Sequence, residues 1–402
     1  MAISALTCPP PVRRADNSAR PDYELLHTAI ELFENGQHAE SLAKTFAHLF
    51  PNHDVPDLGA EPFSFGQGSS RVTVRLKDDS LEVEVPLVRL TSESITTAAL
   101  RFVLSNISAT GQLYQPCLRG DDIYLEFTDR LTRLHPHKVR EVLRLIPVVA
   151  DANDDWMVTE FRCDPLKREP IEALTEAEAA QAETIWATHW REVDELVKES
   201  QRKRSMFFLN EVTAYAVHHI DHALPLTGYW WSRISAAAET FNDTNFNPSA
   251  REAALRKCIR EMQEVSSESL RESLGHAKYA ILPHAEGTPK VLKDNLGAGN
   301  YLDAVLRSHN GGRYMEAAVA MIGSYNYLLA KFSWSSEFER LLLAGLAMST
   351  GKPWREATTL LLEQSELLIA ASEESESEET DDASVDSLVD GQAPHASGQV
   401  QQ

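Results

Sequence analysis

The sequence predicts an α+β domain followed by an all-helical domain, and three observations lead to this prediction. Apolar and polar residues alternate over Arg71–Lys77 and Leu81–Val88, which is the period-two pattern of strands with one wet face. Beyond residue 174 this alternation stops, and apolar residues recur instead at the three- and four-residue spacing of helices. With 402 residues the chain also exceeds one typical hydrophobic core, so two domains are expected.

The first domain is predicted over residues 22–162, and it begins with helix. Apolar residues follow a helical period from Asp22 to Phe50, and Asp22 is a suitable N-cap. Asn35–Gly36 interrupts the pattern, which indicates a kinked helix or two short ones. A short strand over Phe63–Phe65 then precedes the two alternating strands.

The rest of this domain is predicted as helix, two strands and helix. A helix should open at Ser94 and end near Asn106. Gln112–Leu118 and Ile123–Phe127 read as a second hairpin, because a charged, Gly-containing turn separates them. A final helix is expected from about His135 to Asp151. The element order is therefore α-β-β-β-α-β-β-α with an antiparallel sheet.

The remaining segments differ in composition. Residues 1–20 are rich in Pro, Arg and Asn and are predicted to be a flexible leader, and residues 163–174 combine two prolines with clustered charge, as linkers do. Residues 175–371 are predicted to form the helical domain. The tail, 372–402, contains nine acidic and no basic residues between Ser372 and Asp390, and is predicted to be disordered.

The helical domain opens with Thr175 and Glu178, which fit the capping-box pattern. Further helices are predicted near 205–224, 228–241, 248–274, 300–309, 313–331, 336–349 and 353–371. Gly312–Ala317 and Lys352–Ala357 both open helices after a short polar turn. They are similar to the turn and second helix of tetratricopeptide-type hairpins, and stacked hairpins generally serve as partner-binding scaffolds.

Composition excludes several classes of partner and compartment. The formal net charge of −22 repels nucleic-acid phosphates, which disfavours a nucleic-acid partner. No run of about 18 apolar residues is present, so no membrane partner is expected. The apolar stretch at the start is shorter than a signal-peptide core, and four scattered Cys fit a reducing compartment. The cytoplasm is the expected location.

One segment could hold a metal ion. His218 and His222 are one helical turn apart, the arrangement of a two-His metal pair, and Glu211 lies near the same face. The segment lacks the Glu that follows the first His in HExxH enzymes. The alternative is structural, with the histidines packed in a core or solvated. No cofactor is expected otherwise, and no catalytic residue is predicted.

Tyr229, Trp230 and Trp231 are consecutive on a predicted helix. Adjacent aromatic side chains on a helix cannot all face one core. At least one of them is therefore expected at an interface, either between the domains or with a partner protein.

The first domain resembles class I type III secretion chaperones and the YbjN-like proteins over residues 22–162. The resemblance lies in the order of elements, the hairpin Arg71–Val88, the turn Gly120–Asp122 and the closing segment 149–156. It implies dimerisation and the binding of an extended client in an apolar groove. It implies no catalytic residue.

Glu82 and Glu84 lie on the wet face of the strand Leu81–Val88. If this strand borders the sheet, they would select the client that pairs with it. The sequence thus favours an adaptor or chaperone-like assembly factor with a protein partner and a possible homodimer. The alternatives are a metal-dependent helical enzyme using Glu211, His218 and His222, and a non-catalytic regulatory subunit of a larger complex.

Overall fold

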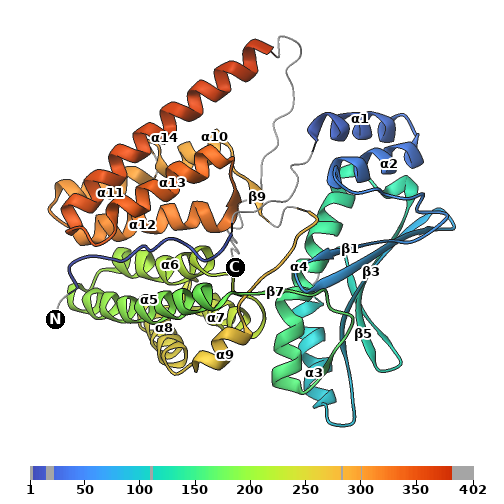
Figure 1. The fold of residues 1–402 in the computed structure, drawn as a ribbon, viewed down its shortest axis with the longest axis horizontal. Helices are drawn as coiled ribbons and strands as arrows, with labels where there is room; N and C mark the ends of the chain where they lie inside the picture. Colours follow the sequence, from blue (N-terminus) through green and yellow to red (C-terminus); the bar gives the residue numbers. More distant parts are fainter. Residues whose placement is uncertain (1–2, 15–21, 109–111, 282–283, 300, 383–402) are drawn as a thin grey trace, which may run out of the picture.

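A computed structural model describes residues 3–14, 22–108, 112–281, 284–299 and 301–382 of the chain (Figure 1). It contains an N-terminal α+β region with an antiparallel sheet and a mostly helical C-terminal region, which confirms the predicted fold class. Residues 1–2 and 15–20 of the expected leader, and 383–402 of the expected tail, lie outside the described residues.

The chain enters the α+β domain through two short helices, α1 (Tyr23–Glu34) and α2 (His38–Leu49). Asp22 caps α1 by accepting hydrogen bonds from the main-chain N–H groups of Glu24 and Leu25. Gly36 has a φ of +78°, a left-handed conformation that suits glycine, and it separates the two helices. The interruption predicted at this point is confirmed.

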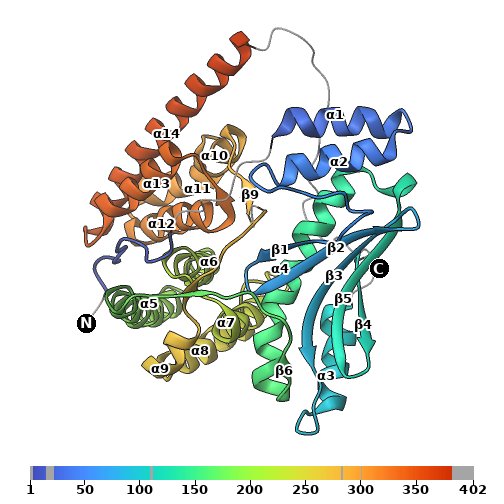
Figure 2. The ribbon, with the colours of Figure 1, turned by 45° about the vertical axis from the view of Figure 1, so that its right-hand side comes forward.

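Five strands form the sheet in the order β1-β2-β3-β5-β4, and each neighbouring pair is antiparallel (Figure 2). They are β1 (Phe63–Gln67), β2 (Ser70–Lys77), β3 (Ser80–Arg89), β4 (Gln115–Arg119) and β5 (Asp122–Arg130). A two-residue strand, β6 (Asp164–Pro165), adds to the end of β3.

One face of the sheet is covered by helix α4 (Pro136–Phe161), which packs on β2, β3 and β5. This helix continues ten residues beyond its predicted end at Asp151. A shorter helix, α3 (Thr96–Phe102), runs into a π-helical turn over Val103–Ile107 and packs beside α4. The opposite face of the sheet is polar, as the alternation in the sequence predicts.

The helical domain begins at α5 (Glu176–Lys203), whose predicted capping box between Thr175 and Glu178 is present. The helices that follow are α6 (Met206–Ala223), α7 (Gly228–Phe241), α8 (Pro248–Gln263), α9 (Ser267–Glu272), α10 (Pro289–Leu296), α11 (Tyr301–Asn310), α12 (Tyr314–Lys331), α13 (Ser336–Ser349) and α14 (Trp354–Asp382). Two pairs of two-residue strands lie outside the main sheet. In one pair β7 (Glu172–Ala173) pairs with β8 (Gly275–His276), and in the other β9 (Ala285–Glu286) pairs with β10 (Phe332–Ser333).

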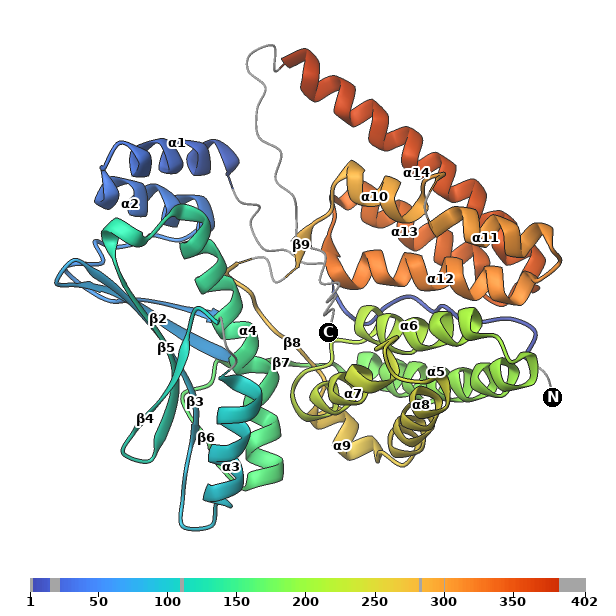
Figure 3. The same ribbon diagram turned by 180° about the vertical axis from the view of Figure 1, so that it is seen from behind.

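The helices of the second half pack in the predicted pairs. Helix α11 lies against α12, and α13 lies against α14 (Figure 3). Helix α14 extends beyond residue 371, where the sequence predicted its end, and Ser372 is fully buried. The helix α10 was not predicted.

Two segments that were expected to be loose are packed in the structure. In the leader, Leu6, Cys8 and Val12 are buried in the core of the helical domain. In the linker, Cys163 and Leu166 are buried, and β6 and β7 both pair with other strands. Among the described helices, none is both long and apolar enough to cross a membrane.

Candidate functional site

The outer edge of β1 is occupied by an extended segment of the helical domain, residues 276–281, which we call the strap. The N–H of Gly68 donates to the carbonyl of Lys278 at 3.0 Å, and the N–H of Ala280 donates to the carbonyl of Gly66 at 3.3 Å. Gln67 and Tyr279 form an antiparallel bridge. The strap therefore satisfies the edge strand in the way that an added β-strand does.

The side chain of Gln67 forms hydrogen bonds with the backbone of the strap. It is 1% exposed, and its Nε2 donates to the carbonyl of Ile281 at 2.7 Å. Its Oε1 accepts hydrogen bonds from the N–H groups of Ala280 and Ile281, both at 3.0 Å. Because these bonds go to the backbone of the strap, they recognise an extended chain and not one particular side chain.

Ile281 fixes the register of the strap. Its side chain is 4% exposed and belongs to the hydrophobic core of the α+β domain, although in sequence the residue lies between α9 and α10 of the helical domain. Beyond it lies a cavity of about 500 Å³ between α4 and residues 284–286. The cavity combines the apolar Leu49 and Ile281 with Arg140 and Arg144 of α4.

The turn between β1 and β2, residues 68–69, is hydrogen-bonded to two carboxylates of α4. The N–H of Ser69 donates to Asp151 Oδ1 at 2.7 Å, and its hydroxyl donates to Asp154 Oδ2 at 2.9 Å. Arg168 lies 3.1 Å from Asp154 Oδ2. Burial raises the pKa of both carboxyl groups, against the opposing effect of these hydrogen bonds and of Arg168. Gly68 has a φ of +66°, and a Cβ there would lie 2.8 Å from the Asp151 carboxyl group.

The other border of the sheet is β4, and it is poorly suited to pairing. It is five residues long, as β1 is, but it contains Pro116, which has no N–H to donate. Leu118 on this strand is 51% exposed. A proline in an edge strand is a common protection against pairing. Because β1 has no proline and already pairs with the strap, it is the edge suited to an extended segment.

The structure corrects the prediction for Glu82 and Glu84. Both lie on β3, which is the central strand between β2 and β5 and not an edge. Glu82 forms an ion pair with Arg75 at 2.5 Å, and Glu84 forms one with Arg119. These carboxylates belong to cross-strand charge pairs on the polar face, so they cannot select a strand that pairs with the sheet edge.

Of the aromatic triplet, Tyr229 lies at the contact between the two domains, and Trp230 and Trp231 contact residues of the helical domain. Tyr229 stacks on Trp156 of α4, with ring centroids 5.7 Å apart, and its hydroxyl donates to Glu160 at 2.7 Å. Trp230 donates to Ser269 at 3.0 Å, and Trp231 lies beneath the ammonium group of Lys331 at 5.7 Å. An interface position, as predicted, is thus taken by Tyr229 between the domains. A partner contact of the triplet stays a prediction.

The residues of the predicted metal site are engaged separately. Glu211 accepts a hydrogen bond from Tyr301, and burial raises its pKa to about 7. His218 packs its ring on Tyr327, and His222 is buried; burial lowers their pKa values to about 4 and about 3. Within the described ranges, no three His, Cys, Asp or Glu side chains are grouped so that they could hold a metal ion.

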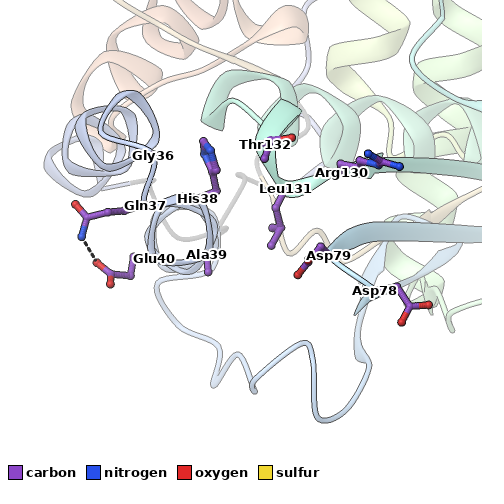
Figure 4. A pocket seen from close by; sticks show the side chains of 10 residues that line it. All are labelled: Gly36, Gln37, His38, Ala39, Glu40, Asp78, Asp79, Arg130, Leu131 and Thr132. Atoms are coloured by element: carbon purple, nitrogen blue, oxygen red, sulfur yellow. Dashed lines mark hydrogen bonds between the residues drawn. The ribbon is translucent and has the colours of Figure 1, made fainter.

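A second cavity, of about 580 Å³, lies between the α1–α2 turn and the tip of the β2–β3 hairpin (Figure 4). Asp78 and Asp79 form the hairpin turn, and both have positive φ angles. Gln37 Nε2 donates to Glu40 Oε2 at 3.0 Å on the opposite wall. The acidic residues of this cavity, like those elsewhere in the described part of the chain, form no group of three that could hold a metal ion.

The sequence did not reveal Gln67 or Ile281. Gln67 ends a short strand and Ile281 lies in an irregular stretch, so neither follows a helical or strand period that would mark it. Their contact spans 214 positions. A possible signal was the apolar Ala280–Ile281 pair in a segment between helices, where an exposed loop would be polar.

No protein-family model matches the sequence, and no curated protein matches it.

Proposed function

We propose that this protein is an adaptor or chaperone-like assembly factor that holds an extended segment of a client protein on its α+β domain. The strap is the observation that supports this most directly. An extended segment already adds to the β1 edge through backbone hydrogen bonds and anchors one apolar side chain, Ile281, in the core. These are the contacts by which strand addition gives affinity and specificity.

The resemblance to class I type III secretion chaperones and YbjN-like proteins is part of this proposal. The order of elements along 22–162 supports it, and the resemblance implies an extended client and a homodimer. The paired helices of the second domain, compared above with tetratricopeptide-type hairpins, would add a scaffold for the same or another partner. A cytoplasmic location fits such a role.

The client is an extended segment with one branched apolar residue at the position that Ile281 occupies. The cavity beyond Ile281 is lined by Arg140 and Arg144, although Glu141 pairs with Arg144. An acidic residue that follows the apolar anchor would meet Arg140, whose guanidinium lies over the ring of Tyr23 at 5.8 Å. The client must displace the strap to bind.

A photo-crosslinking residue at Ser64 on β1, or at Leu118 on β4, tests this in cells. Ser64 is exposed and two residues before the start of the strap pairing. We expect client adducts at Ser64, with a several-fold higher yield when Ile281→Ala loosens the strap, and few adducts at Leu118. Equal yields at both positions, or no adducts, would contradict the proposal. A single partner whose adduct does not depend on Ile281 would favour the regulatory-subunit alternative.

A further inference from the structure

The helical domain holds an extended segment of its own, residues 3–14. The segment crosses the domain between the layer of α5 and α6 and the layer of α12, α13 and α14 (Figures 1 and 3). Leu6, Cys8 and Val12 are 2%, 5% and 5% exposed, whereas Thr7 and Pro10 face solvent. The segment therefore lies in a groove and anchors only some of its side chains.

Side chains of the helical domain bind the backbone of this segment. Glu192 of α5 accepts from the N–H of Thr7 at 3.2 Å, and Gln181 donates to the carbonyl of Pro10 at 2.9 Å. The hydroxyl of Thr350 contacts both main-chain groups of Cys8: the Cys8 N–H donates to it at 3.2 Å, and it lies 2.8 Å from the Cys8 carbonyl oxygen. Such contacts tolerate different side chains at the exposed positions.

The segment also pairs with main-chain groups at the end of α6 and in the turn after α13. The carbonyl of Ala223, at the end of α6, accepts from the N–H of Val12 at 2.8 Å and from that of Arg13 at 3.3 Å. After α13, the N–H of Gly351 donates to the carbonyl of Leu6 at 2.9 Å. The carbonyl of Ala223 lies in the last turn of α6, where main-chain carbonyls have no partner within the helix. An extended occupant of the groove therefore supplies donors that the helix itself lacks.

The buried side chain of Glu192 also relies on the segment for a hydrogen-bond donor. Its carboxylate is only 6% exposed, and besides Thr7 it accepts from the hydroxyl of Tyr215 at 3.3 Å. Burial raises the pKa of Glu192, and the hydrogen bonds from Thr7 oppose that rise. Without an occupant, this buried acid would lose a main-chain donor, which is unfavourable for a buried polar group.

We propose that this groove is a peptide-binding site in its own right, and that residues 3–14 are its resident ligand. The partner is a protein that presents an extended, proline-containing segment with apolar or thiol side chains at the positions of Leu6, Cys8 and Val12. The site lies in the helical domain, so it is separate from the β1 edge and independent of the client proposed there. A tethered resident acts at an effective concentration on the order of 1 mM, which keeps the site closed to weak ligands.

Cys8 reports on the occupancy of the groove in the full chain. A synthetic peptide with the sequence of residues 3–14 and the substitution Cys8→Ser is added to the protein, and alkylation of each cysteine is followed by mass spectrometry. We expect saturable acceleration at Cys8, because the displaced segment exposes its thiol, and no change at Cys258, which is also buried. A peptide with Leu6→Asp is the matched control and should have no effect.

Alkylation of Cys8 that stays flat up to about 1 mM peptide, the effective concentration of a short tether, would overturn the proposal. Acceleration at Cys258 as well would indicate general unfolding and would also overturn it. If the full chain forms dimers that dissociate when the peptide is added, the groove binds a second copy of this chain. That result would refute the proposal that its partner is a different protein.

Direct binding to a chain that lacks residues 1–14 gives a second measurement. Fluorescence anisotropy should show that the labelled peptide binds this shortened chain at least about tenfold more tightly than the full chain, because the resident no longer competes. Equal affinity for both chains would contradict the resident-ligand assignment. If the shortened chain does not fold, the alkylation experiment on the full chain decides.

Discussion

Replacing Ile281 with Ala should release the strap from the β1 edge while leaving the two domains folded. The Ile281 side chain is 4% exposed and packs in the core of the α+β domain. Shortening it to Ala removes buried apolar surface at about 0.8 kcal/mol per methylene and leaves a cavity. For a buried isoleucine the total cost is typically about 2–5 kcal/mol.

Most of this cost should appear as easier opening of the strap. The strap has few other apolar anchors: Lys278 is exposed, and Ala280 is half-buried. A loss of about 3 kcal/mol corresponds to roughly a hundredfold change in an opening equilibrium, since about 1.4 kcal/mol is tenfold. The N–H groups of Ala280 and Ile281 donate hydrogen bonds to Gln67. Their hydrogens should therefore exchange with solvent about a hundred times faster in the variant.

Amide hydrogen exchange with peptide-level mass spectrometry measures this change. Ile95→Ala is the matched control, because Ile95 is 48% exposed and the same atoms are removed. A surface change of this kind usually alters stability by about 0.5 kcal/mol or less. If exchange over the strap is the same in Ile281→Ala and Ile95→Ala, then Ile281 does not hold the strap, and the reasoning is refuted.

Three further substitutions test separate contacts by urea unfolding. Gln67→Leu should destabilise the chain by about 1–3 kcal/mol, because it removes the hydrogen-bond partners of the N–H and the carbonyl of Ile281; no change would mean that water or the backbone replaces the side chain. Glu211→Gln should remove a pH dependence. Burial raises the Glu211 pKa to about 7 from 4.5, so wild-type stability relative to the variant should fall, by up to about 3 kcal/mol, as pH rises through that window. A difference that is flat or rises with pH would refute that burial effect. Thr175→Ala should cost about 1 kcal/mol through loss of the α5 cap, and an unchanged midpoint would show that the cap is dispensable.

The histidines should produce the opposite pH dependence. Burial lowers the pKa values of His218, His219 and His222 below their usual 6.5. Their contribution to stability is therefore lost as pH falls from about 6.5 toward 4, where the unfolded chain binds more protons. The carboxyl group of Glu211 acts in the reverse direction over the same range, so only a comparison between variants separates the two effects.

Local patterns predicted much of the fold because they act over a few residues. The alternation of Arg71–Lys77, the Asp22 cap and the capping box at Thr175 each depend on neighbours in the sequence, and the structure contains all three. Helix α10 was missed because it is short, although Thr288 as a cap followed by Pro289 marks its start.

The candidate site was not predictable in the same way. The position of Glu82 and Glu84 depends on the order of strands, which places β5 beside β3 and makes β3 central. An alternating strand reads the same in sequence whether it is central or at an edge. The strap joins Gln67 to Ile281 across 214 positions, and no local pattern encodes such a contact.

The central claim is that the β1 edge accepts an extended segment from another molecule. Binding of an amidated, fluorescent peptide with the sequence of residues 274–281 tests it most directly. We predict saturable binding to the Ile281→Ala chain, at least about tenfold weaker binding to wild type, whose tethered strap competes, and loss of binding when Gln67→Leu is added. Absence of saturable binding to the Ile281→Ala chain up to about 1 mM, the effective concentration of a short tether, would contradict the claim.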